Sequence, residues 1–333
     1  MRCLPGFKKY LIAAFGILAV GLILYRFAGA SVGADELSGW IVEMYDDASG
    51  NQSEFFTISN EEEDKLVVVD GGWSENADQL REVIQEKGGT VDCWIVTHYH
   101  EDHCGAFNQV YADPQGIEIN DIYATPLDRE TFEDVMYSWD NPETFDQFMS
   151  QTEGDERVHY VTRGEELSVG SLHIRFFNTY DEIVTDENYG NRWDIPNNDA
   201  LVFKAWTDTA AEAEAETAAL SETEGSSAAG KSAAVYNSIL FGSDCYSEGI
   251  WNYMEETFGE ELKSKYIQAV HHGNSEMPNR FYEYMDPEVI LFNANEWLML
   301  SEDHKAKDLK AWCDERGITT YDCRDLPLRF SLS

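Results

Sequence analysis

One stretch of the chain reads Thr97-His98-Tyr99-His100-Glu101-Asp102-His103 and places three histidines and one aspartate within six residues. The apolar run 91–96 directly before it is rich in β-branched and aromatic residues, which predicts a buried strand. Residues 105–110 predict the opening of a helix, so the motif should lie on a loop between two rigid elements. Imidazole and carboxylate groups suit zinc and related transition ions. The motif therefore predicts a metal site, with His98 and His100 facing one ion and Asp102 and His103 facing a second.

The spacing His-x-His-x-Asp-His resembles the signature of hydrolases with the metallo-β-lactamase fold, and their other motifs follow in the expected order. One strand pattern ends in Asp70-Gly71, a later one leads to Asp244, and another leads to His271-His272-Gly273. The resemblance covers about residues 38–330. It implies an α/β fold, a four-layer αββα sandwich with two mixed sheets face to face and the metals at one edge.

Finer features indicate a subgroup. The run Asn197-Asn198-Asp199 before a strand pattern, together with the His-His-Gly motif, is similar to the hydrolase domains of DNA-uptake (competence) channel proteins and to phosphorylcholine esterases. Those relatives act on phosphodiesters. Ala200 stands where serine is commoner, and Phe241-Gly242-Ser243-Asp244 replaces the usual Thr-Gly-Asp. These two departures leave the substrate open.

The resemblance also implies a role for each motif residue. The predicted metal ligands are His98 and His100 for the first ion, Asp102, His103 and His272 for the second, and Asp244 as a bridge between them. Two ions roughly 3.5–4 Å apart would hold a hydroxide that attacks phosphorus or a carbonyl carbon. Asp102 and Asp244 are thus the predicted catalytic carboxylates, and two zinc ions are the expected cofactor, with manganese or iron as alternatives. Residues predicted to orient the ligands or to contact the substrate are Asp70, His271, Asn198 and His304.

The ligand set of the first ion is incomplete in the sequence. Relatives recruit a further histidine between the main motif and the bridging aspartate, where this chain has only His159 and His173. Both lie in strand patterns, which favours packing or solvent exposure. Asn198, Asp199 or His271 could replace the missing ligand, or only one metal is held firmly. Aromatic and basic residues that either contact substrate or simply pack are Trp73, Tyr189, Arg192 and Trp193.

Composition and the N-terminus bear on location. The chain has 333 residues, with 23 Lys+Arg against 63 Asp+Glu and a net charge of −40, which argues against a nucleic-acid partner. Three basic residues precede the apolar run 11–25, and Ala28-Gly29-Ala30 follows it. Residues 1–30 are therefore predicted to be a signal peptide or a membrane anchor, and residues 31–333 an exported hydrolase domain, either secreted or anchored facing outside.

Three further features concern organisation. Residues 208–234 are rich in Ala, Glu and Ser and predict a low-complexity surface insertion. Residues 129–152 predict two amphipathic helices broken at Asn141-Pro142, which either roof the site or form an ordinary cap. Cys104 with Cys245, and Cys313 with Cys323, could pair, although buried small apolar side chains are favoured.

The function that the sequence predicts is an extracytoplasmic, metal-dependent hydrolase that cleaves a phosphodiester in a small-molecule or cell-envelope substrate. Hydrolysis of a lactone, thioester or lactam at the same metals is the first alternative. A non-catalytic metal-binding module is the second.

Overall fold

A computed structural model describes residues 38–332, except for 48, 138–139, 141, 191–192 and 209–236. The predictions for residues 1–30 and for nearly all of the low-complexity insertion lie outside the described residues. Within the described part, no helix is both long and apolar enough to cross a membrane.

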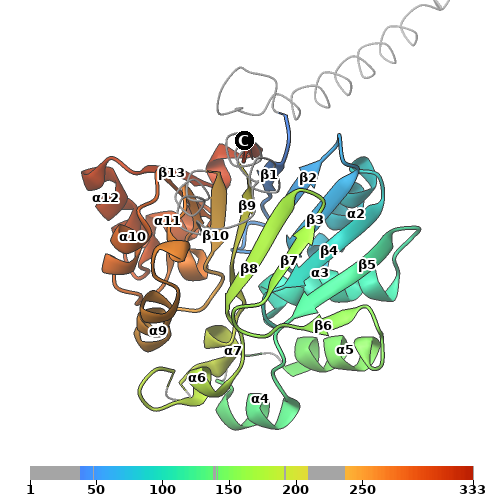
Figure 1. The fold of residues 1–333 in the computed structure, drawn as a ribbon, viewed down its shortest axis with the longest axis horizontal. Helices are drawn as coiled ribbons and strands as arrows, with labels where there is room; N and C mark the ends of the chain where they lie inside the picture. Colours follow the sequence, from blue (N-terminus) through green and yellow to red (C-terminus); the bar gives the residue numbers. More distant parts are fainter. Residues whose placement is uncertain are drawn as a thin grey trace, which may run out of the picture.

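Two seven-stranded sheets form the centre of the molecule (Figure 1). The strand order of the first sheet is β14 (Leu328–Ser331), β1 (Ile41–Met44), β2 (Phe55–Asn60), β3 (Lys65–Asp70), β4 (Thr90–Val96), β5 (Glu118–Ala124), β6 (Val158–Tyr160). The order of the second is β13 (Thr319–Asp322), β12 (Val289–Phe292), β11 (Tyr266–Gln268), β10 (Ser238–Phe241), β9 (Val202–Thr207), β8 (Leu172–Asn178), β7 (Glu166–Val169). Each sheet contains both parallel and antiparallel pairs, as the resemblance implied.

The two faces of each sheet are buried in different places, which gives the four layers. Val67 and Val69 of β3 belong to the apolar cluster between the sheets, whereas Val68 belongs to the one beneath the helices. Phe56 of the first sheet meets Phe241 of the second edge-to-face, with ring centroids 5.1 Å apart. The αββα sandwich is therefore confirmed.

Helices cover both outer faces (Figure 1). On the first sheet lie α2 (Ala77–Glu86), α3 (Glu101–Ala112) and α5 (Pro142–Thr152), and beside the second lie α9 (Glu248–Phe258), α10 (Arg280–Met285), α11 (Glu296–Leu300) and α12 (Ala306–Arg316). Short helices α4 (Arg129–Val135), α6 (Glu182–Thr185) and α7 (Ile195–Asn198) lie at the strand ends below the sheets in the view of Figure 1. The predicted break at Asn141-Pro142 separates α4 from α5.

One expectation from the sequence needs correction. Helix α3 begins at Glu101 rather than near Gly105, so Asp102 and His103 lie in its first turn and not on a loop. The open question of disulfides is also answered for the described cysteines, all of which are free thiols: Cys93, Cys104, Cys245, Cys313 and Cys323. The first four are buried, as favoured for small apolar side chains.

Candidate metal centre

The ends of four strands bring the motifs to one edge of the sandwich. Strands β3 and β4 run parallel in the first sheet, and β10 and β11 run parallel in the second, so the motifs that follow them meet at one end. Within the second sheet the loops after β10 and β11 are tied together, because the backbone N–H of His271 donates to the carbonyl of Ser243 at 2.8 Å. The site is thus built on rigid strand ends.

Asp244 lies at the centre of the cluster. Its Oδ2 atom is 3.8 Å from Nε2 of His98, 3.4 Å from Nε2 of His103, and 3.6 and 3.7 Å from Nε2 of His271 and His272. Nε2 of His103 and Nε2 of His272 make no hydrogen bond to this oxygen, and the four distances match the separations of about 3–4 Å between ligand atoms that share an ion. A carboxylate surrounded in this way can serve two neighbouring metal positions.

The two histidines predicted for the first ion, His98 and His100, lie side by side. Nε2 of His98 lies 3.1 Å from Nδ1 of His100. The other ring nitrogen of His100, Nε2, is 2.9 Å from Oδ1 of Asp140, in the segment between α4 and α5. Asp140 therefore fixes the ring so that Nδ1 faces His98. The segment that the sequence offered as a roof thus touches the site through this carboxylate.

The three residues predicted for the second ion, Asp102, His103 and His272, also lie close together. Nε2 of His272 lies 3.3 Å from Oδ2 of Asp102, and one nitrogen each of His103 and His272 lies within 4.8 Å of an oxygen of Glu54. Glu54 precedes β2 and is fully buried. Ligand-type atoms from three separate segments therefore surround this position.

Asp70 holds the scaffold behind the ligands. Its carboxylate accepts hydrogen bonds from the backbone N–H and the hydroxyl of Thr97, both at 2.7 Å, and contacts Nδ1 of His103 at 2.8 Å. Ser243 in turn donates to the Thr97 hydroxyl at 2.8 Å, which links the two sheets. The orienting role predicted for Asp70 agrees with this arrangement.

Strained backbone is concentrated at this edge. His271 and His272 have φ values of 53° and 56°, in the left-handed region that costs a residue with a side chain roughly 1–2 kcal/mol. The double turn directs both rings toward Asp244. Further left-handed residues that carry side chains here are Asp70, Asp194 and Ser243. Such strain is typical of functional sites.

The protonation equilibria follow from burial and from the density of charge. Burial, helped by the neighbouring imidazoles, holds the pKa of His98 well below its usual value, so its ring is neutral and can bind a metal. Burial also lowers the pKa of His103, but Asp244, Asp102 and Asp70 outweigh it and raise the value. Burial raises the pKa of Asp244, but His103, His272 and His271 outweigh it and lower the value.

A metal fits the residues present. Several buried polar atoms of the cluster have no hydrogen-bond partner: Nε2 of His103, both ring nitrogens of His272, Oδ1 of Asp244 and both carboxylate oxygens of Glu54. Buried polar atoms are normally satisfied, so a group of orphans that are all nitrogen or carboxylate oxygen points to a cation.

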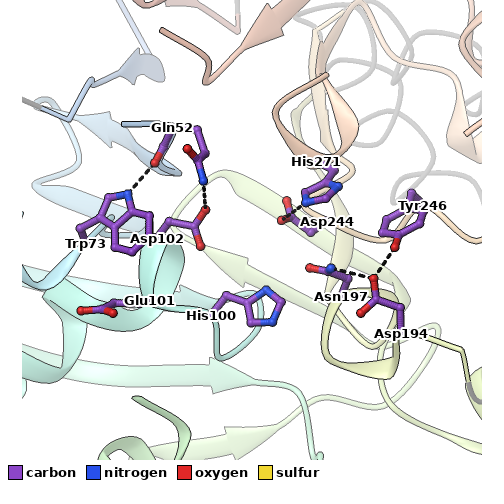
Figure 2. A pocket seen from close by; sticks show the side chains of 10 residues that line it. All are labelled: Gln52, Trp73, His100, Glu101, Asp102, Asp194, Asn197, Asp244, Tyr246 and His271. Carbon is purple, nitrogen blue, oxygen red and sulfur yellow. Dashed lines mark hydrogen bonds and ion pairs between the residues drawn. The ribbon is translucent and has the colours of Figure 1, made fainter. Parts of the chain in front are cut away.

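A pocket of about 400 Å³ opens over the cluster (Figure 2). Figure 2 shows Trp73 and Tyr246 on opposite sides of Asp102 and Asp244. The indole N–H of Trp73 donates to the carbonyl of Gln52 at 2.6 Å, and the Tyr246 hydroxyl donates to Asp194. The lining residues are Gln52, Trp73, His100, Glu101, Asp102, Asp194, Asn197, Asp244, Tyr246 and His271. A small substrate could reach the ligand cluster from this side.

The structure separates the alternatives for the missing ligand. His271 faces Asp244 and lines the pocket. The side-chain oxygen of Asn198 accepts the backbone N–H groups of Tyr246 and Ser247 at 3.1 and 2.8 Å, so its amide holds the loop after Asp244. Asp199 is buried beside Thr125, at 3.4 Å from its hydroxyl. Of the three, only His271 adjoins the ligand cluster.

The remaining histidines lie elsewhere. His159 contacts Asp121 at 2.8 Å, and the ring of His173 stacks on Trp206 with centroids 5.4 Å apart. His304 contacts the hydroxyl of Ser301 at 2.7 Å and does not line the pocket.

Of the aromatic residues considered as substrate contacts, some line the pocket and others pack elsewhere. Trp73 lines the pocket, whereas Trp193 meets Tyr246 edge-to-face at 5.2 Å and is 48% exposed. Tyr189 packs against Tyr253 at 5.1 Å. Arg192 lies outside the described residues.

Two residues of the site were missed by the sequence analysis. Glu54 stands directly before the strand pattern 55–58, and the β2–β3 register places Phe55 opposite Asp70. That register, inferred from the turn at 61–64, could have placed Glu54 at the ligand edge. Asp140 had no such signal, because its contact with His100 depends on how α4 and α5 pack.

Comparisons with known proteins agree with the architecture. The family model described as "Metallo-beta-lactamase superfamily" matches residues 58–175, from β2 to β8, and includes the whole histidine motif. The chain has the metallo-β-lactamase fold. No curated protein matches it by sequence.

Solved structures with this fold are distant in sequence. The E377D mutant of CmlA β-hydroxylase, an enzyme from Streptomyces venezuelae, is 12% identical with a TM-score of 0.50, and the alignment covers 99% of this chain and 60% of CmlA. YhfI from Bacillus subtilis, a metallo-β-lactamase fold protein, is 12% identical with a TM-score of 0.45, covering 86% of this chain and 96% of that one. Igni18, a metallo hydrolase from Ignicoccus hospitalis, is 11% identical with a TM-score of 0.44, covering 85% and 95%.

Proposed function

We propose that this protein is an exported, metal-dependent hydrolase that cleaves a phosphodiester in a small-molecule or cell-envelope substrate. The observation that carries the proposal is the position of Asp244 Oδ2, within 3.4–3.8 Å of four imidazole nitrogens beneath an open pocket. Members of the superfamily whose model matches the chain are mostly metal-dependent hydrolases. Export is proposed from the basic and apolar pattern of residues 1–30.

The residues of the site would perform distinct tasks. Bound divalent cations would supply Lewis acidity and activate a water. Asp244 and the imidazoles around it would hold these cations, while Asp70 keeps His103 oriented and Asp140 keeps His100 oriented. Trp73 and Tyr246 would confine the substrate between them.

The charges around the pocket favour a phosphodiester over a carboxylate-bearing lactam. Among the described residues that line the pocket there is no lysine or arginine. A phosphodiester carries its negative charge on the reacting group, where the metal cations would neutralise it. A substrate with a separate carboxylate would need a further cation to receive it.

The test compares three substrates with two histidine variants. The full chain loaded with metal should hydrolyse bis(p-nitrophenyl) phosphate but neither nitrocefin nor a simple lactone. His98→Gln should reduce the rate about 10³-fold, equal to roughly 4 kcal/mol, because it removes a ligand. His173→Gln, which changes a histidine outside the cluster, should leave the rate within about twofold. Turnover of nitrocefin or the lactone alone would favour the carbonyl alternative, and metal binding without any turnover would favour the binding module.

A further inference from the structure

Glu54 is a buried carboxylate that the function proposed above does not use. It lies directly before β2, it is fully buried, and neither carboxylate oxygen has a hydrogen-bond partner. Its backbone N–H donates to the carbonyl of Asp102 at 3.0 Å. This bond fixes Glu54 against the first turn of α3, which carries Asp102 and His103.

The atoms that face Glu54 are themselves without partners. One nitrogen each of His103 and His272 lies within 4.8 Å of a Glu54 oxygen and of one another. Nε2 of His103 and both ring nitrogens of His272 make no hydrogen bond. Ligand atoms on opposite sides of one ion, with bonds of roughly 2.1 Å, lie about 4.2 Å apart. The three side chains make no hydrogen bonds to one another, and the limit of 4.8 Å on their separations is close to the span of atoms that share an ion.

The cost of burial argues against a passive role. A carboxylate removed from water without a hydrogen bond costs several kcal/mol unless a cation or proton compensates it. The described residues around it offer it imidazoles and further carboxylates, so a bound cation is the compensation that this environment fits.

We propose that Glu54 is an additional carboxylate ligand of the second metal position, together with Asp102, His103, Asp244 and His272. This inference rests on the metal centre of the proposed function. Three carboxylates and two imidazoles make a set that is richer in oxygen and in ligand number than a four-coordinate zinc site. Such a set suits a six-coordinate ion, so Glu54 should favour manganese or iron over zinc at this position.

The test measures metal binding by equilibrium dialysis of the full chain against Mn²⁺ and, separately, Zn²⁺, with metal content read by plasma mass spectrometry. Glu54→Gln should weaken Mn²⁺ binding at one of two positions about 100-fold, weaken Zn²⁺ binding less, and leave the other position unchanged. Asp199→Asn is the matched control, because it neutralises another fully buried carboxylate away from the cluster and should bind both metals like the wild type. Glu54→Asp, which keeps the charge one methylene further away, should bind Mn²⁺ with intermediate affinity and serves if the glutamine variant does not fold.

Each other outcome is decisive. Wild-type affinity for Mn²⁺ in both Glu54 variants would overturn the proposal, as would an equal loss in Glu54→Gln and Asp199→Asn. A wild-type chain that binds neither metal would instead contradict the proposed function itself.

Discussion

Asp70 and Glu54 are two fully buried carboxylates at the same end of the β2–β3 hairpin, and their surroundings are opposite. Asp70 accepts two hydrogen bonds from Thr97 and contacts His103, all within 2.8 Å. Glu54 has no hydrogen-bond partner for either oxygen. Hydrogen bonding therefore distinguishes a carboxylate that stabilises the fold from one that is available to a ligand, although both are fully buried.

The physical reason is the cost of desolvation. A buried charge with several donors is compensated by the protein itself, so its removal leaves those donors without an acceptor. A buried carboxyl without donors takes up a proton when no cation is bound, so its replacement by an amide should matter for metal binding and little for the metal-free fold. Substitutions of Asp70 and of Glu54 should therefore differ in their effects on stability and on metal binding.

Asp70→Ala should lower the free energy of unfolding of the metal-free protein by about 3–5 kcal/mol, because the N–H and hydroxyl of Thr97 lose their acceptor. Asp70→Asn keeps one acceptor oxygen and should lose less. Glu54→Gln should change stability by less than about 1 kcal/mol in the same buffer. Urea unfolding in the presence of a chelator measures all three. A loss of unfolding free energy in Glu54→Gln as large as that in Asp70→Ala would contradict the difference between the two carboxylates.

Lys204 is a buried charge that its hydrogen-bond partners compensate only in part. Its buried ammonium donates to the carbonyls of Glu261 and Lys263 at 2.7 and 3.4 Å, and burial lowers its pKa to about 8. Between pH 8 and about 10.5 the unfolded chain holds the proton that folded Lys204 has released, so stability should rise with pH across this window.

Lys204→Met removes that contribution. The difference in unfolding free energy between wild type and Lys204→Met should therefore grow in favour of the wild type by up to about 3 kcal/mol from pH 8 to 10.5. Taking the difference cancels the tyrosines that also titrate in this range. Parallel stability curves for the two proteins would show that the ammonium is fully compensated by its carbonyl partners.

Asp140 should have the smallest effect, because its carboxylate acts on the site only through its contact with His100. Asp140→Asn keeps an acceptor for Nε2 of His100 but removes the charge, so metal affinity at the first position should fall about 10-fold. Asp121→Asn is the matched control, because Asp121 makes the same kind of contact with His159 at 2.8 Å outside the site. Equilibrium dialysis against Zn²⁺ measures the metal affinity of both variants. Equal Zn²⁺ affinities of Asp140→Asn and Asp121→Asn would show that Asp140 does not contribute to metal binding.

The fold was predictable from the sequence because its deciding residues are local. The spacing from His98 to His103 and the strand patterns before Asp70, Asp244 and His272 each stand within a few residues of one another. Such patterns depend on the regular geometry of strands, and the structure confirms the sandwich that they imply. The predicted start of α3 was wrong. Glu101 and Asp102 suit the first turn of a helix, where carboxylates are favoured, but they were interpreted only as part of the metal-binding motif.

The parts of the site that the sequence could not give depend on long-range packing. Asp140 meets His100 only because the break between α4 and α5 lies over the motif. His271 was one of three open alternatives, and the left-handed turn at His271-His272 selects it by directing its ring toward Asp244. Asn198 and Asp199 were plausible by residue type alone, yet their oxygens face backbone N–H groups and Thr125.

Asp244 is proposed to join two metal positions, and the metal content of the purified protein tests this role directly. The full chain, purified after loading with Zn²⁺ or Mn²⁺, should hold about two ions per chain by plasma mass spectrometry, and Asp244→Ala should hold fewer than one. Asp199→Asn, treated identically, should hold two. One ion or none in the wild type, unchanged in Asp244→Ala, would contradict the account.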